Sequence, residues 1–195
     1  MMESRFQPVI LASQSPRRKE LLARIFSDFQ VCPAHADESL TPGFTPKQNV
    51  ACLAQRKAQA VAQHSDCQAL IIASDTIVVC DDVILGKPEN EADAVRMLRQ
   101  LSGRTHQVMT AVCVKTPERE LTQVSVTDVT FRTLRDGEAE AYTATGEPMD
   151  KAGAYGIQDR AALMVRRLEG DYFNVMGLPL CRLGQMLEEI GVHLF

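Results

Sequence analysis

The sequence of 195 residues has no long hydrophobic run. A membrane-spanning helix needs about 20 mostly apolar residues, and no stretch approaches that length, so we expect no membrane as partner. Near the start, an apolar run covers only residues 9–12 before polar residues return. That run is too short for a signal peptide, so we expect none.

Closely spaced metal or redox motifs are also missing. The cysteines form no Cys-x-x-Cys pair and the histidines form no His-Glu-x-x-His motif, so a zinc site is not expected. Several cysteines fall in apolar segments, where cysteine usually acts as a small hydrophobic residue. This usage fits a reducing compartment and predicts a cytoplasmic protein. The six cysteines are Cys32, Cys52, Cys67, Cys80, Cys113 and Cys181.

The chain carries no excess of positive charge. Its formal net charge of -4 argues against a dedicated nucleic-acid binder, so any basic patch must be local. Internal repeats, low-complexity segments and linker-like changes in composition are absent. Strand and helix patterns alternate, and a hydrophobic content of 45% is enough for a sizeable core. We expect a single α/β domain over residues 1–195, with one compact body or two lobes around a cleft.

The most informative stretch runs from Pro8 to Phe26. Its apolar run predicts a buried strand, and apolar residues at helical spacing then predict an amphipathic helix that reaches Phe26. Ser15 suits the N-cap of this helix, and Pro16 suits its first position. Three cations follow in the first turn, where each costs about 0.3–1 kcal/mol against the helix dipole. They are Arg17, Arg18 and Lys19.

A bound polyanion would explain these cations. Helix N–H groups, the hydroxyls of Ser13 and Ser15, and the guanidinium groups of Arg17 and Arg18 would then converge on phosphate. A sequence that breaks a local rule this plainly often marks a functional site. The alternative is a solvated basic turn whose charge is screened by water, and the pattern leaves both open.

One carboxylate interrupts a second apolar run. Residues 69–79 have the composition of a strand that is buried on both faces, yet Asp75 lies within them. A buried unpaired carboxylate costs several kcal/mol, so Asp75 must be solvated, hydrogen-bonded or near a cation. Hydroxyl residues flank it on both sides, which favours a functional role. The alternative is an aspartate at a strand end that caps a turn.

The second predicted helix, which begins at Thr45 or Pro46 and ends near Gln63, carries a further cation. Thr45 provides the N-cap and Pro46 the first helical position. Lys57 falls on or near the apolar face of this helix. It either extends its charge to solvent from a buried stem or belongs to a site, and the pattern does not separate these alternatives.

The segment from Gly146 to Gln158 is predicted to be a long loop. Long loops in compact domains are usually functional or disordered, and glycines in this one allow close approach of the backbone to a ligand. Lys151 can contact a phosphate, and the Gln158 amide offers both a donor and an acceptor. An ordinary structured loop with solvated charges is the alternative.

Taken together, these motifs resemble the Maf family of nucleoside triphosphate pyrophosphatases, and the resemblance covers nearly the whole chain. It implies an α/β fold similar to the inosine triphosphate pyrophosphatase-like fold, in which a twisted mixed central sheet is flanked by helices in two lobes around a cleft. The matching segments are SQSPRR at 13–18, SDT at 74–76, LGKP at 85–88, DKAGAYGIQ at 150–158 and NVMGLP at 174–179.

The resemblance also implies roles for individual residues. Asp75 takes the position of the proton acceptor. Arg17, Thr76 and Gln158 stand at the specificity positions of the branch that is similar to dTTP/UTP pyrophosphatases. The residues expected to bind the substrate phosphates are Ser13, Ser15, Arg17, Arg18, Lys57, Lys87 and Lys151.

Carboxylates beside phosphates imply magnesium or manganese, because these hard cations take oxygen ligands. Glu38 and Asp75 are the candidate ligands, and the sequence does not separate metal ligand from base for Asp75. No covalent nucleophile with an adjacent base is recognisable, so we expect water to attack the α-phosphorus directly. The products would be a nucleoside monophosphate and pyrophosphate.

Two functions therefore remain. The first is a cytoplasmic pyrophosphatase that removes dTTP, UTP and modified pyrimidine nucleotides. The second is a non-catalytic nucleotide-binding regulator of cell division, because the family is also linked to arrest of septum formation. A homodimer stays open for either function, and neither involves nucleic acid.

Overall fold

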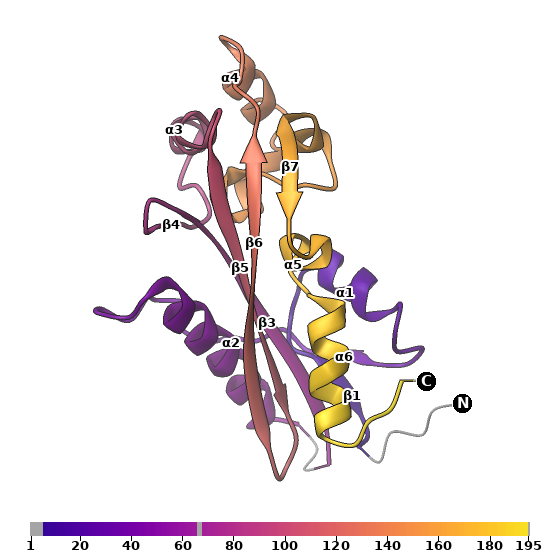
Figure 1. Ribbon diagram of the computed structural model, residues 1–195. Helices are drawn as coiled ribbons and strands as arrows, with labels where there is room; N and C mark the ends of the chain where they lie inside the picture. The colour runs from indigo at the N-terminus through magenta and orange to yellow at the C-terminus, as the bar shows by residue number, and fades with distance from the viewer. Residues whose placement is uncertain (1–5, 66–67, 195) are drawn as a thin grey trace. The chain divides into compact units, whose positions relative to one another are not determined.

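The computed structural model describes residues 6–65 and 68–194, so Cys67 and the first five residues lie outside its scope (Figure 1). The chain divides into two compact units. The first comprises Met1–Asp75, Thr110–Ser125 and Gly177–Phe195, and the second comprises Thr76–Met109 and Val126–Met176.

A mixed sheet has the strand order β2-β1-β3-β5-β6-β7, and β4 pairs with β3 off this path. β1 is parallel to both β2 and β3, whereas β4 is antiparallel to β3 and β7 is antiparallel to β6. The strands are β1 (Val9–Leu11), β2 (Gln30–Val31), β3 (Leu70–Cys80), β4 (Val83–Leu85), β5 (Thr105–Lys115), β6 (Glu120–Phe131) and β7 (Val165–Glu169).

Helices flank this sheet, which confirms the predicted α/β class with a mixed central sheet. The helices are α1 (Pro16–Leu22), α2 (Pro46–Ala62), α3 (Glu91–Leu101), α4 (Glu138–Thr143), α5 (Tyr172–Met176) and α6 (Leu180–Glu189), with 3-10 helices η1 (Glu147–Asp150), η2 (Ala152–Ala154) and η3 (Arg160–Met164). Over residues 6–65 and 68–194, none of these helices combines the length and the apolar character that crossing a membrane requires.

Two helix starts form as the sequence predicts. The Ser15 hydroxyl accepts a hydrogen bond from the backbone N–H of Arg18 at the start of α1. At the start of α2, Thr45 and Gln48 form a reciprocal capping box. Each cap satisfies a backbone donor that has no partner within its own helix.

Two boundaries differ from the prediction. α1 ends at Leu22 instead of reaching Phe26, because the N–H groups of Arg24 and Ile25 bond to carbonyls three residues back and tighten the chain into a turn. The segment predicted as a loop from Gly146 to Gln158 contains the short helices η1 and η2. Three-residue periodicity leaves little trace in a sequence, so short 3-10 helices are hard to predict.

The core of the first unit contains β1, whose residues are all buried. Ile10 of β1 lies opposite Gln30 of β2 and Ile71 of β3, so this strand is interior to the sheet. Leu21 and Leu22 of α1 are fully buried in the same unit. This burial explains the continuous apolar run that precedes the Ser13–Arg18 turn.

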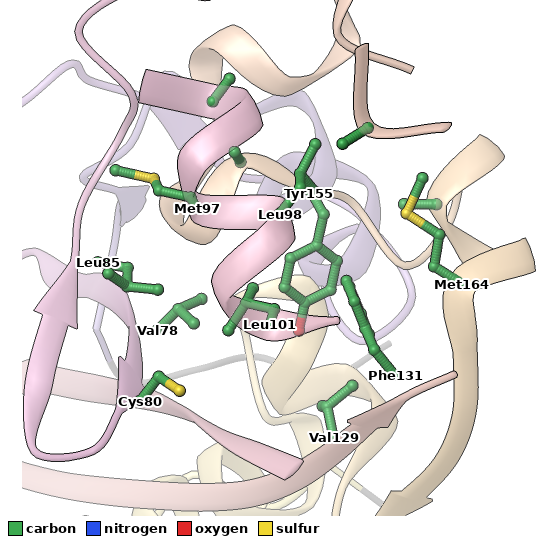
Figure 2. Close-up of a cluster of buried hydrophobic side chains, with 14 of the residues drawn as sticks. Val78, Cys80, Leu85, Met97, Leu98, Leu101, Val129, Phe131, Tyr155 and Met164 are labelled. Carbon is green, nitrogen blue, oxygen red and sulfur yellow. The ribbon is translucent and has the colours of Figure 1, made fainter. Parts of the chain in front are cut away.

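The core of the second unit forms around α3 (Figure 2). Ala94, Met97, Leu98 and Leu101 recur at helical spacing and are all buried. Figure 2 shows the last three of them beside side chains from β3, β4, β6 and the segment that follows η2. The apolar face of α3 therefore holds this unit together.

His106 is buried in the second unit beside two aromatic rings. Its Nε2 atom lies 2.8 Å from the Tyr155 hydroxyl, and its ring lies edge-on to Phe131 at 5.0 Å between centroids. Its Nδ1 atom has no hydrogen-bond partner among the described residues. Burial lowers the pKa of His106 from 6.5 to about 4, so the imidazole is neutral at pH 7.

This histidine should make the protein less stable in mild acid. Between pH 6.5 and about 4 the unfolded chain binds a proton at His106 that the folded chain does not, so stability falls as the pH falls. From pH 7 to pH 5 the unfolding free energy should drop by about 2 kcal/mol on this account. His106→Gln should reduce that drop in urea titrations at the two pH values, whereas the exposed His64→Gln should not. An equal drop in all three proteins would contradict the assignment.

Candidate functional site

In the first unit, Lys57 of α2 lies between two carboxylates. Its Nζ atom is 2.7 Å from Glu38 Oε1 and also forms a short contact with Asp75 Oδ1. The side chains of Lys57 and Asp75 are only 11% and 14% exposed, whereas that of Glu38 is 59% exposed. The interpretation of Lys57 as a solvent-directed cation is therefore wrong, because both carboxylates bind its ammonium group.

Asp75 lies inside β3, which continues to Cys80, so its interpretation as a turn cap at a strand end is also wrong. Successive side chains of a strand point to opposite faces, and the preceding Ser74 is fully buried. The Ser74 hydroxyl donates to the carbonyl oxygen of Gly177 at 2.9 Å. Asp75 instead contacts the ammonium group of the largely buried Lys57 side chain, so it has the cationic partner that a carboxylate in a buried strand needs.

The same carbonyl of Gly177 also holds Arg18. The Arg18 Nε atom donates to it at 3.0 Å, and Nη1 donates to the Ser13 hydroxyl at 3.4 Å. A solvated basic turn is therefore wrong for Arg18, whose guanidinium group is anchored. The Gly177 carbonyl joins the first turn of α1 to Ser74, the strand residue that precedes Asp75.

Arg18 interacts electrostatically with the same carboxylates. Desolvation is the largest effect and lowers the Arg18 pKa, the carboxylates of Asp75 and Glu38 oppose this, and Arg17 adds to the lowering. An arginine remains charged at neutral pH in such a setting. Arg18, Glu38, Lys57 and Asp75 thus form one group of charges, which we call the Asp75 cluster.

The serines predicted to bind phosphate also shape the turn before α1. The buried Ser13 hydroxyl accepts from the backbone N–H of Ser15 at 3.2 Å, in addition to its bond from Arg18. Both bonds use the oxygen as an acceptor, so the Ser13 O–H group can still donate to an anion. Arg17 is half-buried on the first turn of α1.

In the second unit, Lys151 is buried between η1 and η2. Its Nζ atom donates to the backbone carbonyl of Glu147 and to Asp150 Oδ1, each at 2.7 Å. These bonds provide the partners that a buried ammonium group requires. The structure thus places Lys151 with Asp150, a neighbouring carboxylate that the sequence motif also contains.

A backbone hydrogen bond connects the residue before Lys87 to the segment that contains Lys151. The N–H of Gly153 donates to the carbonyl of Gly86 at 3.0 Å, directly before Lys87. Gly153 has φ of 67°, and a Cβ atom there would lie 2.8 Å from a methyl group of Val78 on β3. Only glycine fits this position, which explains one of the glycines in the motif. Lys87 itself is exposed.

The remaining predicted specificity residues also belong to the second unit. Thr76 follows Asp75 on β3, and Gln158 lies between η2 and η3. Both residues are half-buried. Their side chains are therefore partly accessible to a ligand. The strand holds the backbone at Thr76, and the two 3-10 helices hold it at Gln158.

Sequence reasoning missed two residues that shape these groups. Gly177 acts through a carbonyl oxygen, which every residue has, so no side chain signals it. Tyr142 of α4 donates to Glu147 Oε1 at 2.7 Å, next to the carbonyl that holds Lys151. No local sequence pattern marks Tyr142, and only its tertiary contact distinguishes it.

The pair Glu38 and Asp75 fits part of a site for a divalent cation. Their oxygen atoms already converge on one positive charge, and oxygen atoms are the ligands that magnesium and manganese prefer. Over residues 6–65 and 68–194, no group of three or more His, Cys, Asp and Glu residues could hold a metal ion. Phosphate oxygens and water would have to complete such a site.

Solved structures show where this fold recurs. The Ham1 protein of Staphylococcus aureus superposes with a TM-score of 0.53 over 93% of this chain and 98% of its own, at 16% sequence identity. At this identity the likeness concerns the fold alone. It agrees with the mixed sheet and flanking helices described above.

Comparisons of the sequence find relatives of much higher identity. A protein of Geobacillus sp. (strain WCH70) named dTTP/UTP pyrophosphatase is 51% identical over 94% of this chain and 98% of its own. A protein of the same name from Moorella thermoacetica is 50% identical over 96% of this chain and 97% of its own. The family model described as Maf-like protein matches residues 8–190, a range that holds every residue of the Asp75 cluster as well as Lys151, so this chain belongs to the Maf family.

Proposed function

We propose that this chain hydrolyses dTTP and UTP to the nucleoside monophosphate and pyrophosphate. The observation that carries the proposal is the Asp75 cluster, where a largely buried carboxylate on a rigid strand lies beside the cations Lys57 and Arg18. A carboxylate so placed can accept a proton, and the cations can bind phosphate. The names of the relatives point to the same reaction.

In the proposed reaction, a water molecule attacks the α-phosphorus while Asp75 accepts its proton. The bond between the α-phosphorus and the bridging oxygen breaks, and pyrophosphate leaves with that oxygen. Arg18 and Lys57 stabilise the negative charge that develops on the phosphate oxygens. The hydroxyls of Ser13 and Ser15 and the guanidinium of Arg17 add phosphate contacts.

We further propose that a divalent cation binds at Glu38 and Asp75 together with the substrate phosphates. Bound there, it would neutralise phosphate charge and lower the pKa of a coordinated water molecule. Lys87 and Lys151 are the proposed phosphate ligands of the second unit. A cytoplasmic location and a homodimer are retained as part of the same proposal.

The direct experiment measures pyrophosphate release from dTTP, UTP, CTP, ATP, GTP and 7-methyl-GTP, with magnesium and with EDTA. We expect the highest kcat/KM for dTTP and UTP, and a large loss in EDTA. A non-catalytic regulator of cell division would bind a nucleotide without releasing pyrophosphate. That alternative is less favoured, because a pure binding site has no need of a largely buried carboxylate like Asp75.

Gln158→Ala should weaken the preference for pyrimidine nucleotides. Uracil and thymine present an N3–H donor between two carbonyl acceptors, and the half-buried Gln158 amide can pair with that edge. The ratio of kcat/KM for UTP to that for 7-methyl-GTP should fall by roughly 5- to 150-fold, which corresponds to roughly 1–3 kcal/mol. The exposed Gln185→Ala is the control. An unchanged ratio would mean that Gln158 does not recognise the base. Thr76 and Arg17 would then be the remaining candidates for that role.

The two arginines of the α1 turn should behave differently on substitution. Arg17→Ala should raise the KM for UTP without lowering the melting temperature, because the side chain occupies an unfavourable end of the helix dipole. Arg18→Ala should raise KM and also lower the melting temperature by a few degrees, because it removes the hydrogen bond from Arg18 to the Gly177 carbonyl. Kinetics and thermal melts of both variants are the measurement. Identical melting temperatures would contradict the structural role of Arg18.

A further inference from the structure

The chain between Glu147 and Gly156 bends around the side chain of Lys151. At one end of the bend, the Glu147 carbonyl accepts a hydrogen bond from Lys151 Nζ at 2.7 Å. At the other end, a Cβ atom on Gly156 would lie 2.7 Å from Lys151 Cε and 2.9 Å from Cδ. The backbone of Gly156 therefore lies directly against the stem of Lys151, and the separation of the two ends determines where the ammonium group is held.

One side chain from outside the bend anchors its first end, at Glu147. Tyr142 is buried on α4, and its hydroxyl donates to Glu147 Oε1 at 2.7 Å. The backbone of Gly156 acts on the same hydroxyl only by lowering its pKa, against the effect of burial. The Tyr142 hydroxyl thus anchors Glu147, whose backbone carbonyl binds the Lys151 ammonium group from one end of the bend.

The chemistry of Tyr142 suits a fixed anchor for Glu147. Burial is the largest effect on its pKa and raises it, and the hydrogen bond to Glu147 raises it further. The hydroxyl therefore remains protonated at neutral pH and donates to Glu147. A hydrogen bond from a neutral donor to a charged acceptor is stronger than one between neutral groups.

We infer that Tyr142 is a positioning residue for Lys151, which it holds in place by anchoring Glu147. This inference rests on the proposed function in one respect, since Lys151 is there assigned to the substrate phosphates. Tyr142 itself touches neither substrate nor reacting atoms in this scheme. It acts only by fixing the bend that surrounds the ammonium group.

Two tyrosine variants test the inference. Tyr142→Phe removes the hydroxyl that anchors Glu147 and keeps the ring, and it should lower kcat/KM for UTP by about 10-fold, mainly through KM. Tyr155→Phe is the matched control, because it removes another buried hydroxyl of the same unit, whose partner is His106. It should lower the melting temperature to a similar extent and leave kcat/KM within about 2-fold of the unmodified protein.

A double-mutant cycle shows whether Tyr142 acts through Lys151. In the Lys151→Ala background, Tyr142→Phe should cause no further loss of kcat/KM, because the group that it positions is gone. An undiminished 10-fold loss in that background would overturn the inference. So would a Lys151→Ala variant as active as the unmodified protein, even though pyrophosphatase activity would then stand.

A second readout does not depend on activity. The rate at which an N-hydroxysuccinimide ester acylates Lys151, measured by peptide mass spectrometry, should rise several-fold in Tyr142→Phe and stay unchanged in Tyr155→Phe. Equal rates in all three proteins would overturn the inference. If the unmodified protein releases no pyrophosphate from any nucleotide, the proposed function fails, and the acylation rates alone decide whether Tyr142 positions Lys151.

Discussion

Asp75→Asn is expected to lower kcat for UTP hydrolysis by at least about 10²-fold, the scale of losing a general base. Asparagine keeps the shape of the side chain but cannot accept a proton from water, and it is a poor ligand for a divalent cation. The fold should survive, because Lys57 keeps its 2.7 Å contact with Glu38 and β3 keeps its ladder. Pyrophosphate release under saturating UTP is the measurement.

Asp28→Asn provides the matched control for this substitution. Asp28 is an exposed aspartate of the same unit, and the change in composition and charge is identical. Circular dichroism and the melting temperature should be close to those of the unmodified protein for both variants. If Asp75→Asn kept activity within a few-fold while folded, Asp75 would be neither base nor metal ligand.

The prediction that Asp75 needs a partner is confirmed by its contact with Lys57, and it rested on a local energetic conflict. A carboxylate within a buried strand needs a cation or a hydrogen bond, whatever the rest of the fold looks like. The caps at Ser15 and Thr45 were predictable for a similar reason, since each involves residues only three positions apart. Such features can be predicted because they depend only on residues within a short segment of the sequence.

The contacts that shape the site could not be predicted in the same way. Arg18 and Gly177 are separated by 159 positions, and their bond uses a backbone carbonyl that carries no signal of its own. Lys57 lay on a predicted helix face, but its two partners come from a loop and from β3, so the sequence left its role open. Tyr142 depends on the bend of a segment whose 3-10 helices were not predicted. These features follow from tertiary packing.

Lys57→Met is expected to lower kcat/KM for UTP by roughly 10²-fold, the scale of removing one preorganised electrostatic group. Methionine keeps the length and the apolar stem, but Asp75 and Glu38 lose the cation that they share. Breaking a buried ion pair is costly, and the cost is reduced here because Glu38 is more than half exposed. The unfolding free energy should therefore fall by roughly 1–3 kcal/mol, measured in urea.

The same variant separates the role of Lys57 from that of a metal. Without the ammonium group, Glu38 and Asp75 repel each other, so magnesium should raise the melting temperature of Lys57→Met more than that of the unmodified protein. Lys115→Met is the control, since Lys115 pairs with one half-buried carboxylate of the same unit at 2.9 Å. It should keep kcat/KM within about 2-fold. A magnesium response that is equal in all three proteins would mean that Glu38 and Asp75 do not bind the cation, and the metal would then have to be sought elsewhere. Because the readout is a melting temperature, this result does not depend on whether Lys57→Met retains any turnover.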